Sequence, residues 1–274
     1  MRVFVLVDME GVAGVVNSEE LRSGNPEYER ARRLMTAEAS AVVAGILDAA
    51  PDAEVMVADA HASYRNIIPE LLDSRARLLR GKPSLDGMVD GLDETYDLAM
   101  FIGMHGQAGA GASVLSHTFS DALLDVRLNE HRYGELGLNA AMAGAAGVPV
   151  ALVAGDQVVA AEARDALGSA AIAVVVKQSR SAGRADAPHP TAAGAMLREA
   201  AARALHEREA MEPMRVAAPV TIEITLAQSA YADRAQLIEG IERMDGRTIR
   251  ATRADVPAAY RLLRLVMLLC SVRE

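Results

Sequence analysis

Short apolar runs alternate with longer Ala-rich segments through most of the chain, a pattern typical of α/β proteins. The first run, Val3–Val7, is apolar at every position, as a strand buried on both faces requires. We expect further strands at Glu54–Ala58, Ala76–Leu79, Tyr96–Gly103, Val148–Val153 and Ala171–Val176. The fold class is therefore α/β, with a mostly parallel sheet flanked by helices.

The intervening segments carry helix signals. Asn25 is a suitable N-cap and Pro26 suits the first helical position, so we expect a helix from Pro26 to about Ala50. Two more helices are expected at Val158–Leu167 and His189–Leu205. Between the strand expected at Ala171–Val176 and the helix expected at His189–Leu205, the segment Gly183–Pro188 has the most loop-like composition.

The pattern changes from about Pro213. Val220–Leu226 alternates apolar and polar residues, the sign of a half-exposed strand. A helix at Ala230–Arg243, a strand at Thr248–Arg253 and a helix at Pro257–Leu269 are expected to follow. We therefore divide the chain into an α/β metal-binding catalytic domain, residues 1–212, and a smaller α+β lobe packed against it, residues 213–274.

Composition sets the character of the core and of the partners. Of 274 residues, 51% are hydrophobic but only 3% are aromatic, so the core must be aliphatic. The formal net charge of −9 argues against nucleic acid and anionic membrane as partners, because both need basic patches. The apolar N-terminal run is too short for a signal peptide or a membrane span. We expect a soluble, cytoplasmic protein.

The single cysteine, Cys270, rules out an internal disulfide and a cysteine-rich zinc site. It lies in an apolar run, where a lone cysteine is typically part of the core. Any metal ion bound to this chain must therefore take His and carboxylate ligands.

Residues able to bind metal follow several of the expected strands. Asp8 and Glu10 follow the first strand, His61 follows the second and His105 follows Tyr96–Gly103. In open α/β sheets, sites form beyond the carboxyl ends of the strands. We therefore expect these four side chains to meet. Further strand-end residues are Asp59, which we expect to orient a ligand, and Asp156.

The donor types indicate the metal. Asp8 and Glu10 lie two positions apart and point to the same side of an extended backbone, where their charges repel unless a cation lies between them. His61 and His105 add imidazole nitrogens. Each acid alone is more typical of a helix cap, but the mixed nitrogen and oxygen set favours zinc, with manganese or cobalt as substitutes.

Two further residues each have two interpretations. His117, in a polar Gly-rich context, is either a hydrogen-bonded loop histidine or a catalytic histidine able to move protons near neutral pH. Lys177, just past an apolar strand, is either a surface lysine with a buried stem or a charge partner for substrate.

Five short motifs, in order, resemble the zinc-dependent D-aminopeptidases encoded with dipeptide transporters. They are V-D-M-E-G (Val7–Gly11), D-A-H (Asp59–His61), G-M-H-G (Gly103–Gly106), S-H-T (Ser116–Thr118) and G-E-L-G-L-N-A (Gly134–Ala140). No single motif is specific, whereas the ordered set is. Ala154–Asp156 and Val175–Lys177 fit the same pattern.

The resemblance implies two zinc ions per chain. Asp8 would bridge them, Glu10 and His61 would complete one site, and His105 and Glu135 the other. Glu135 comes from the resemblance alone, since its local sequence is more typical of a helix start. His117 is implied as the catalytic residue, either as a nucleophile or as a general acid/base.

The resemblance also implies a homo-oligomer, a decamer of two stacked five-fold rings, acting on short peptides that contain D-amino acids. The expected activity is that of a metallo-aminopeptidase, with a metal or Asp156 holding the free α-amine of the substrate. Two alternatives stay open: a metal-dependent amidohydrolase or esterase with a non-peptide substrate, and a non-catalytic metal-containing protein that binds small molecules.

Overall fold

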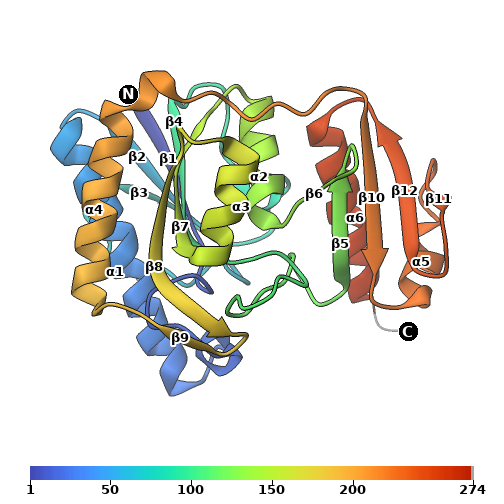
Figure 1. Cartoon of the computed structure of the whole chain (residues 1–274), viewed down its shortest axis with the longest axis horizontal. Helices are drawn as coiled ribbons and strands as arrows, with labels where there is room; N and C mark the ends of the chain where they lie inside the picture. The colour runs from blue at the N-terminus through green and yellow to red at the C-terminus, as the bar shows by residue number, and fades with distance from the viewer. Residues whose placement is uncertain (273–274) are drawn as a thin grey trace.

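The chain forms two sheets that lie side by side with helices packed around them (Figure 1). The structure is a computed structural model that describes residues 1–272. The larger sheet has seven strands in the order β3-β2-β1-β4-β7-β8-β9. Its strands are β1 (Arg2–Val7), β2 (Glu54–Asp59), β3 (Arg77–Leu79), β4 (Leu98–Met104), β7 (Val150–Asp156), β8 (Ile172–Ser181) and β9 (Arg184–Asp186).

The first six strands in this order pair in parallel, and only β9 runs antiparallel to its neighbour. Four helices cover the faces of this sheet. They are α1 (Pro26–Ala49) and α4 (Pro190–His206), which pack on each other, and α2 (Glu135–Ala145) and α3 (Gln157–Leu167). Figure 1 shows α1 and α4 on one face and α2 and α3 on the other. The expected α/β class is confirmed.

The second sheet has five antiparallel strands in the order β11-β12-β10-β5-β6. They are β5 (Leu123–Leu128), β6 (His131–Arg132), β10 (Val220–Leu226), β11 (Glu242–Arg243) and β12 (Thr248–Arg253). Helix α5 (Ser229–Ala235) and helix α6 (Val256–Ser271) pack on it. Helix α6 also packs on α2, so it lies between the two sheets (Figure 1).

Most expected elements lie where the hydrophobic pattern predicts them. The side chain of Asn25 accepts a hydrogen bond from the backbone N–H of Glu27, and Pro26 begins α1. The expected strands at Val220–Leu226 and Thr248–Arg253 have the predicted bounds. The division into domains 1–212 and 213–274 remains a prediction; β5 and β6, from the middle of the chain, pair into the second sheet.

Two local predictions are wrong. The expected helix Ala230–Arg243 ends at Ala235, and its last two residues form β11. Gly240 lies at φ +75°, a left-handed conformation that breaks a helix, and Glu242 and Arg243 then pair with β12. The segment predicted as a loop at 183–188 contains β9, which pairs back on β8.

Three short 3₁₀ helices lie in the loops near the large sheet, at Ser18–Leu21, Pro69–Leu71 and Gly87–Val89, and a fourth lies at Arg208–Ala210. Among residues 1–272, no helix has both the length and the apolar character that crossing a membrane requires. The cytoplasmic location remains a prediction.

Candidate metal centre

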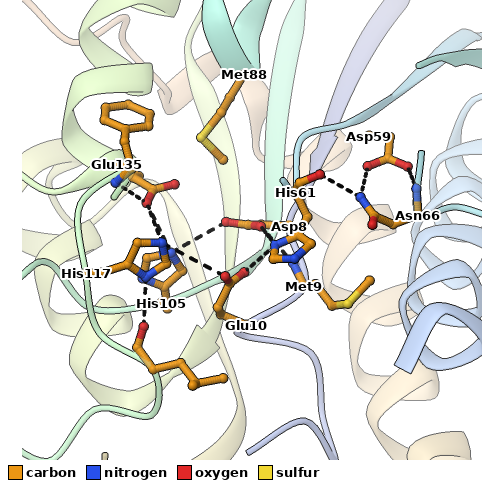
Figure 2. A network of polar contacts seen from close by, with 12 residues as sticks. Asp8, Met9, Glu10, Asp59, His61, Asn66, Met88, His105, His117 and Glu135 are labelled. Carbon is orange, nitrogen blue, oxygen red and sulfur yellow. Dashed lines mark hydrogen bonds and ion pairs between the residues drawn. The ribbon is translucent and has the colours of Figure 1, made fainter. Parts of the chain in front are cut away.

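The five expected ligand residues lie together at the carboxyl edge of the large sheet (Figure 2). Asp8 directly follows β1, His61 lies two residues after β2, and His105 directly follows β4. Because β2, β1 and β4 are neighbours in a parallel sheet, their carboxyl ends meet at one edge. Glu10 lies in the turn after β1, and Glu135 is the first residue of α2.

Two glycines allow the turn that carries Glu10 to touch the end of β4. The backbone N–H of Gly11 donates to the carbonyl of Gly103 at 2.8 Å. Gly103 has φ +68°, and a Cβ there would lie 2.0 Å from the carbonyl oxygen of Asp8. A Cβ on Gly11 would lie 1.9 Å from the carbonyl oxygen of Met104. Only glycine fits such contacts, so these residues bring the first turn against His105.

The five side chains form two groups that share Asp8. One contains Asp8, Glu10 and His61, the other Asp8, His105 and Glu135, and the potential ligand atoms within each group lie within 4.8 Å of one another. Asp8 Oδ1 lies 3.3 Å from His61 Nδ1, whereas Asp8 Oδ2 lies 3.6 Å from His105 Nε2. One carboxylate thus faces both groups with different oxygens, the arrangement that a bridging ligand needs.

The outer ligands complete each group. Glu10 Oε2 lies 2.9 Å from His61 Nδ1, and Glu135 Oε1 lies 3.3 Å from His105 Nε2. All five residues are buried. Within residues 1–272, neither His61 Nε2 nor His105 Nε2 has a hydrogen-bond partner.

The orientation of His105 favours metal binding. Its Nδ1 lies 3.0 Å from the carbonyl oxygen of Gly106, which can only accept, so Nδ1 carries the proton. The lone pair is therefore on Nε2, which faces Asp8 and Glu135. A backbone carbonyl that fixes the tautomer in this way is a common feature of metal-binding histidines. Together with the mixed nitrogen and oxygen donors, this arrangement fits zinc.

The charges of the cluster also call for a cation. Burial and the neighbouring Glu10 charge raise the pKa of Asp8 to about 7. Burial would lower the pKa of His105, but Glu135 and the other carboxylates raise it to about 10. Burial opposes ionisation of Glu10 as well, yet the adjacent His61 holds the pKa of Glu10 well below its ordinary value. Three buried carboxylates thus require compensating positive charge, which metal cations supply when the histidines are neutral.

His117 lies beside the two groups and comes from the long loop between β4 and β5 (Figure 2). Its ring stacks on that of His105, with centroids 4.3 Å apart. Its Nδ1 donates to the carbonyl oxygen of Leu115 at 2.9 Å, so the neutral ring has its lone pair on Nε2. That atom lies 3.4 Å from Glu135 Oε1 and 4.0 Å from Glu10 Oε1.

A cavity of about 180 Å³ opens onto this cluster. Side chains of Asp8, Glu10, His61, His117 and Glu135 line it, so the cluster is accessible to a small molecule. The side chain of His117 is 26% exposed, whereas that of His105 is 1% exposed. His117 is therefore placed to exchange protons with a bound ligand, and His105 is not.

Asp59 does not reach the cluster but supports the loop that carries His61. Its carboxylate accepts hydrogen bonds from the backbone N–H groups of Asn66 and Ile67 and from Asn66 Nδ2. Asn66 Nδ2 also donates to the carbonyl of His61 at 2.6 Å. Sequence reasoning missed Asn66, and nothing in its local sequence indicates this contact.

Both sequence interpretations of Lys177 are wrong. The residue is 2% exposed, and its ammonium group donates to the carbonyl oxygens of Glu10, Val12 and Val15 at 2.5, 3.1 and 2.6 Å. Burial lowers its pKa to about 8. All three donors are used within the protein, so Lys177 is not free to bind substrate; it fixes the loop that carries Glu10.

The expectation that Asp156 holds the substrate α-amine is also wrong. Asp156 is the N-cap of α3, and its Oδ1 accepts from the backbone N–H groups of Val158 and Val159. Its Oδ2 accepts from the hydroxyls of Ser113 and Ser179. The residue is 1% exposed, and these hydrogen bonds leave its carboxylate no capacity for a ligand.

Comparison with known proteins places these features in a family context. A family model described as peptidase M55, D-aminopeptidase, matches residues 1–265. A D-aminopeptidase from Bacillus subtilis (strain 168) is 34% identical over 268 residues, which cover 97% of this chain and 96% of that protein.

Among solved structures, the chain is similar to the Zn-dependent D-aminopeptidase DppA from Bacillus subtilis, described as a self-compartmentalizing protease. The TM-score is 0.95 at 32% sequence identity, and the match covers 100% of this chain and 99% of the other. The similarity therefore extends over both sheets.

Proposed function

Because this chain belongs to the peptidase M55 family of D-aminopeptidases, we propose that it is a zinc-dependent aminopeptidase that hydrolyses short peptides containing D-amino acids. The observation that carries the proposal is the pair of buried ligand groups that share Asp8. In a structural zinc site, four protein ligands usually close the coordination sphere. Here the ligand groups face a cavity, as a catalytic site requires.

Two zinc ions per chain are proposed, on the same ligand set. Glu10 and His61 would hold one ion and His105 and Glu135 the other, with Asp8 between them. Zinc held there supplies Lewis acidity, which polarises a carbonyl oxygen and lowers the pKa of water. The protein must keep both histidines neutral for this, and the carbonyl of Gly106 fixes the tautomer of His105 accordingly.

His117 is the proposed catalytic residue. The carbonyl of Leu115 fixes its proton on Nδ1, so its Nε2 keeps a free lone pair. This atom lies near the carboxylates of Glu10 and Glu135, and His117 lines the cavity. From this position Nε2 accepts a proton when water attacks the amide and returns it to the leaving amine. A nucleophilic role for the same atom uses the same lone pair, and trapping of a covalent adduct on His117 distinguishes the two.

His117→Ala tests this assignment. We expect turnover to fall about 10²- to 10⁴-fold, the usual contribution of general acid–base catalysis, while zinc content stays at the wild-type level. His131→Ala is the matched control, because His131 is exposed. Full activity in His117→Ala would remove this residue from the mechanism.

Side-by-side assays of D-Ala-D-Ala, L-Ala-L-Ala, Gly-Gly and simple amides and esters test the substrate class. The proposal predicts that the zinc-loaded protein prefers the D-dipeptide. Preference for a non-peptide amide or ester would instead identify a related amidohydrolase or esterase. No hydrolysis of any of these compounds would indicate a non-catalytic binding protein.

A homo-oligomer is proposed from the similarity to a self-compartmentalizing protease, and a decamer is the specific assembly that the family resemblance implies. Ten chains of 29.0 kDa have a mass of about 290 kDa. Sedimentation velocity would detect that mass, and a monomer or dimer at micromolar concentration would contradict the proposal. A cytoplasmic location is proposed with it, and fractionation of cells checks this.

A further inference from the structure

Two cationic side chains line the same cavity as the acidic cluster. Lys82 lies in the loop between β3 and the 3₁₀ helix Gly87–Val89, and Arg264 lies on α6. Within residues 1–272, neither forms an ion pair with a carboxylate. The cavity therefore has an acidic wall, formed by Asp8, Glu10 and Glu135, and a cationic wall with no counter-ion of its own.

The protein holds this cationic pair in place. Arg264 Nη2 donates to the carbonyl oxygen of Ser84 at 3.0 Å, which ties α6 to the loop that carries Lys82. Lys82 Nζ lies 4.5 Å from the centre of the Tyr64 ring, a cation–π contact. Tyr64 also lines the cavity, so one aromatic ring supports the pair from the cavity wall.

Tyr64 lies within electrostatic range of both walls. Burial raises its pKa to about 12; the Arg264 guanidinium opposes this rise, and the carboxylates of Asp8 and Glu135 reinforce it. Burial and then the charge of Arg264 lower the pKa of Lys82. The two positive charges thus lie near each other in the lining of one cavity, where a single anion can interact with both.

The size of the cavity limits what that anion can be. Pockets for drug-sized ligands measure roughly 300–1,000 Å³, whereas this cavity measures about 180 Å³. A dipeptide or tripeptide is of suitable size. In a dipeptide, the free carboxylate lies one residue beyond the scissile amide, so a peptide bound at the acidic cluster brings its carboxylate into the same small cavity that Lys82 and Arg264 line.

We propose that Lys82 and Arg264 form a subsite for the free C-terminal carboxylate of a short peptide. The subsite would select di- and tripeptides with a free carboxyl end over amidated peptides. Arg264 offers a planar fork of N–H donors that matches a carboxylate, and Lys82 adds a second positive charge. This inference rests on the proposed aminopeptidase function and names a determinant of its substrate choice.

The test compares kcat/KM for D-Ala-D-Ala and for its C-terminal amide, with zinc-loaded protein. We expect wild type to prefer the free acid about 10- to 100-fold, the size of a hydrogen bond to a charged group. In Arg264→Gln and in Lys82→Gln this ratio should fall toward one, with unchanged zinc content. Arg261→Gln is the matched control, because Arg261 lies on the same helix but is exposed and pairs with Asp86.

A wild-type ratio near one, or an unchanged ratio in both variants, would overturn the subsite. Lys82 is exposed, so Lys82→Gln keeps the test valid even if loss of the Arg264–Ser84 hydrogen bond unfolds the other variant. If zinc-loaded wild type hydrolyses neither compound, the proposed function fails, and the subsite fails with it.

Discussion

Replacement of Glu38 by Gln is predicted to change how stability depends on pH. Glu38 lies on α1, is 4% exposed, and its Oε1 accepts a hydrogen bond from the backbone N–H of Ala13 at 2.8 Å. Its Oε2 has no partner among residues 1–272. Burial raises its pKa from 4.5 to about 7, although Ala13 N–H and the charge of Lys177 oppose the rise.

The magnitude follows from linkage. Between pH 4.5 and about 7, folded protein binds a proton at Glu38 that unfolded protein releases, so stability falls as pH rises through this window. At about 1.36 kcal/mol per pKa unit, ionisation lowers the free energy of unfolding by about 3 kcal/mol above pH 7. Gln keeps the acceptor oxygen for Ala13 but cannot ionise.

Urea unfolding of wild type and Glu38→Gln at pH 4.5, 6 and 8 measures this effect, at fixed protein and zinc concentrations. The variant should gain about 2–3 kcal/mol relative to wild type between the lowest and the highest pH. Glu199→Gln, an exposed change on α4, is the matched control. Parallel pH profiles for wild type and Glu38→Gln would refute the reasoning.

Two further variants test the supports of the metal ligands. Asn66→Ala removes the hydrogen bonds from Nδ2 to Asp59 and to the carbonyl of His61 and should weaken zinc binding about 10- to 100-fold, measured by competition with a chelator; unchanged affinity would show that Asn66 does not orient His61. Lys177→Met leaves the buried carbonyls of Glu10, Val12 and Val15 without their donor, at a cost of about 1–3 kcal/mol each, so both thermal stability and zinc affinity should fall. Wild-type zinc affinity in a folded Lys177→Met protein would contradict its role in fixing the Glu10 loop.

The parallel sheet and its edge were accessible from sequence because local signals agree there. Continuous apolar runs mark strands buried on both faces, and the residues after them must lie at one edge. That reasoning found Asp8, Glu10, His61 and His105, and the structure brings all four together. Their roles as metal ligands remain a proposal.

Other features depend on contacts that a local pattern does not contain. Glu135 begins a helix, where acids are common for reasons of capping and dipole, so only its family motif set it apart. Lys177 lies within β8, where its sequence position resembles that of a surface lysine, yet three carbonyls from a loop more than 160 residues earlier enclose its ammonium group. Strand β5 was missed because its pairing partner β10 lies far along the chain, and the two-residue β6 is too short to give a pattern of its own.

The central claim, that Asp8 joins two metal-binding groups, is tested most directly by zinc content per chain in wild type and in Asp8→Ala. Plasma emission spectrometry of zinc-loaded, dialysed protein measures it, with the exposed Asp52→Ala as control. The account predicts two zinc ions in wild type and in the control, and none or one in Asp8→Ala. Wild type that holds no zinc, or Asp8→Ala that still holds two, would contradict it.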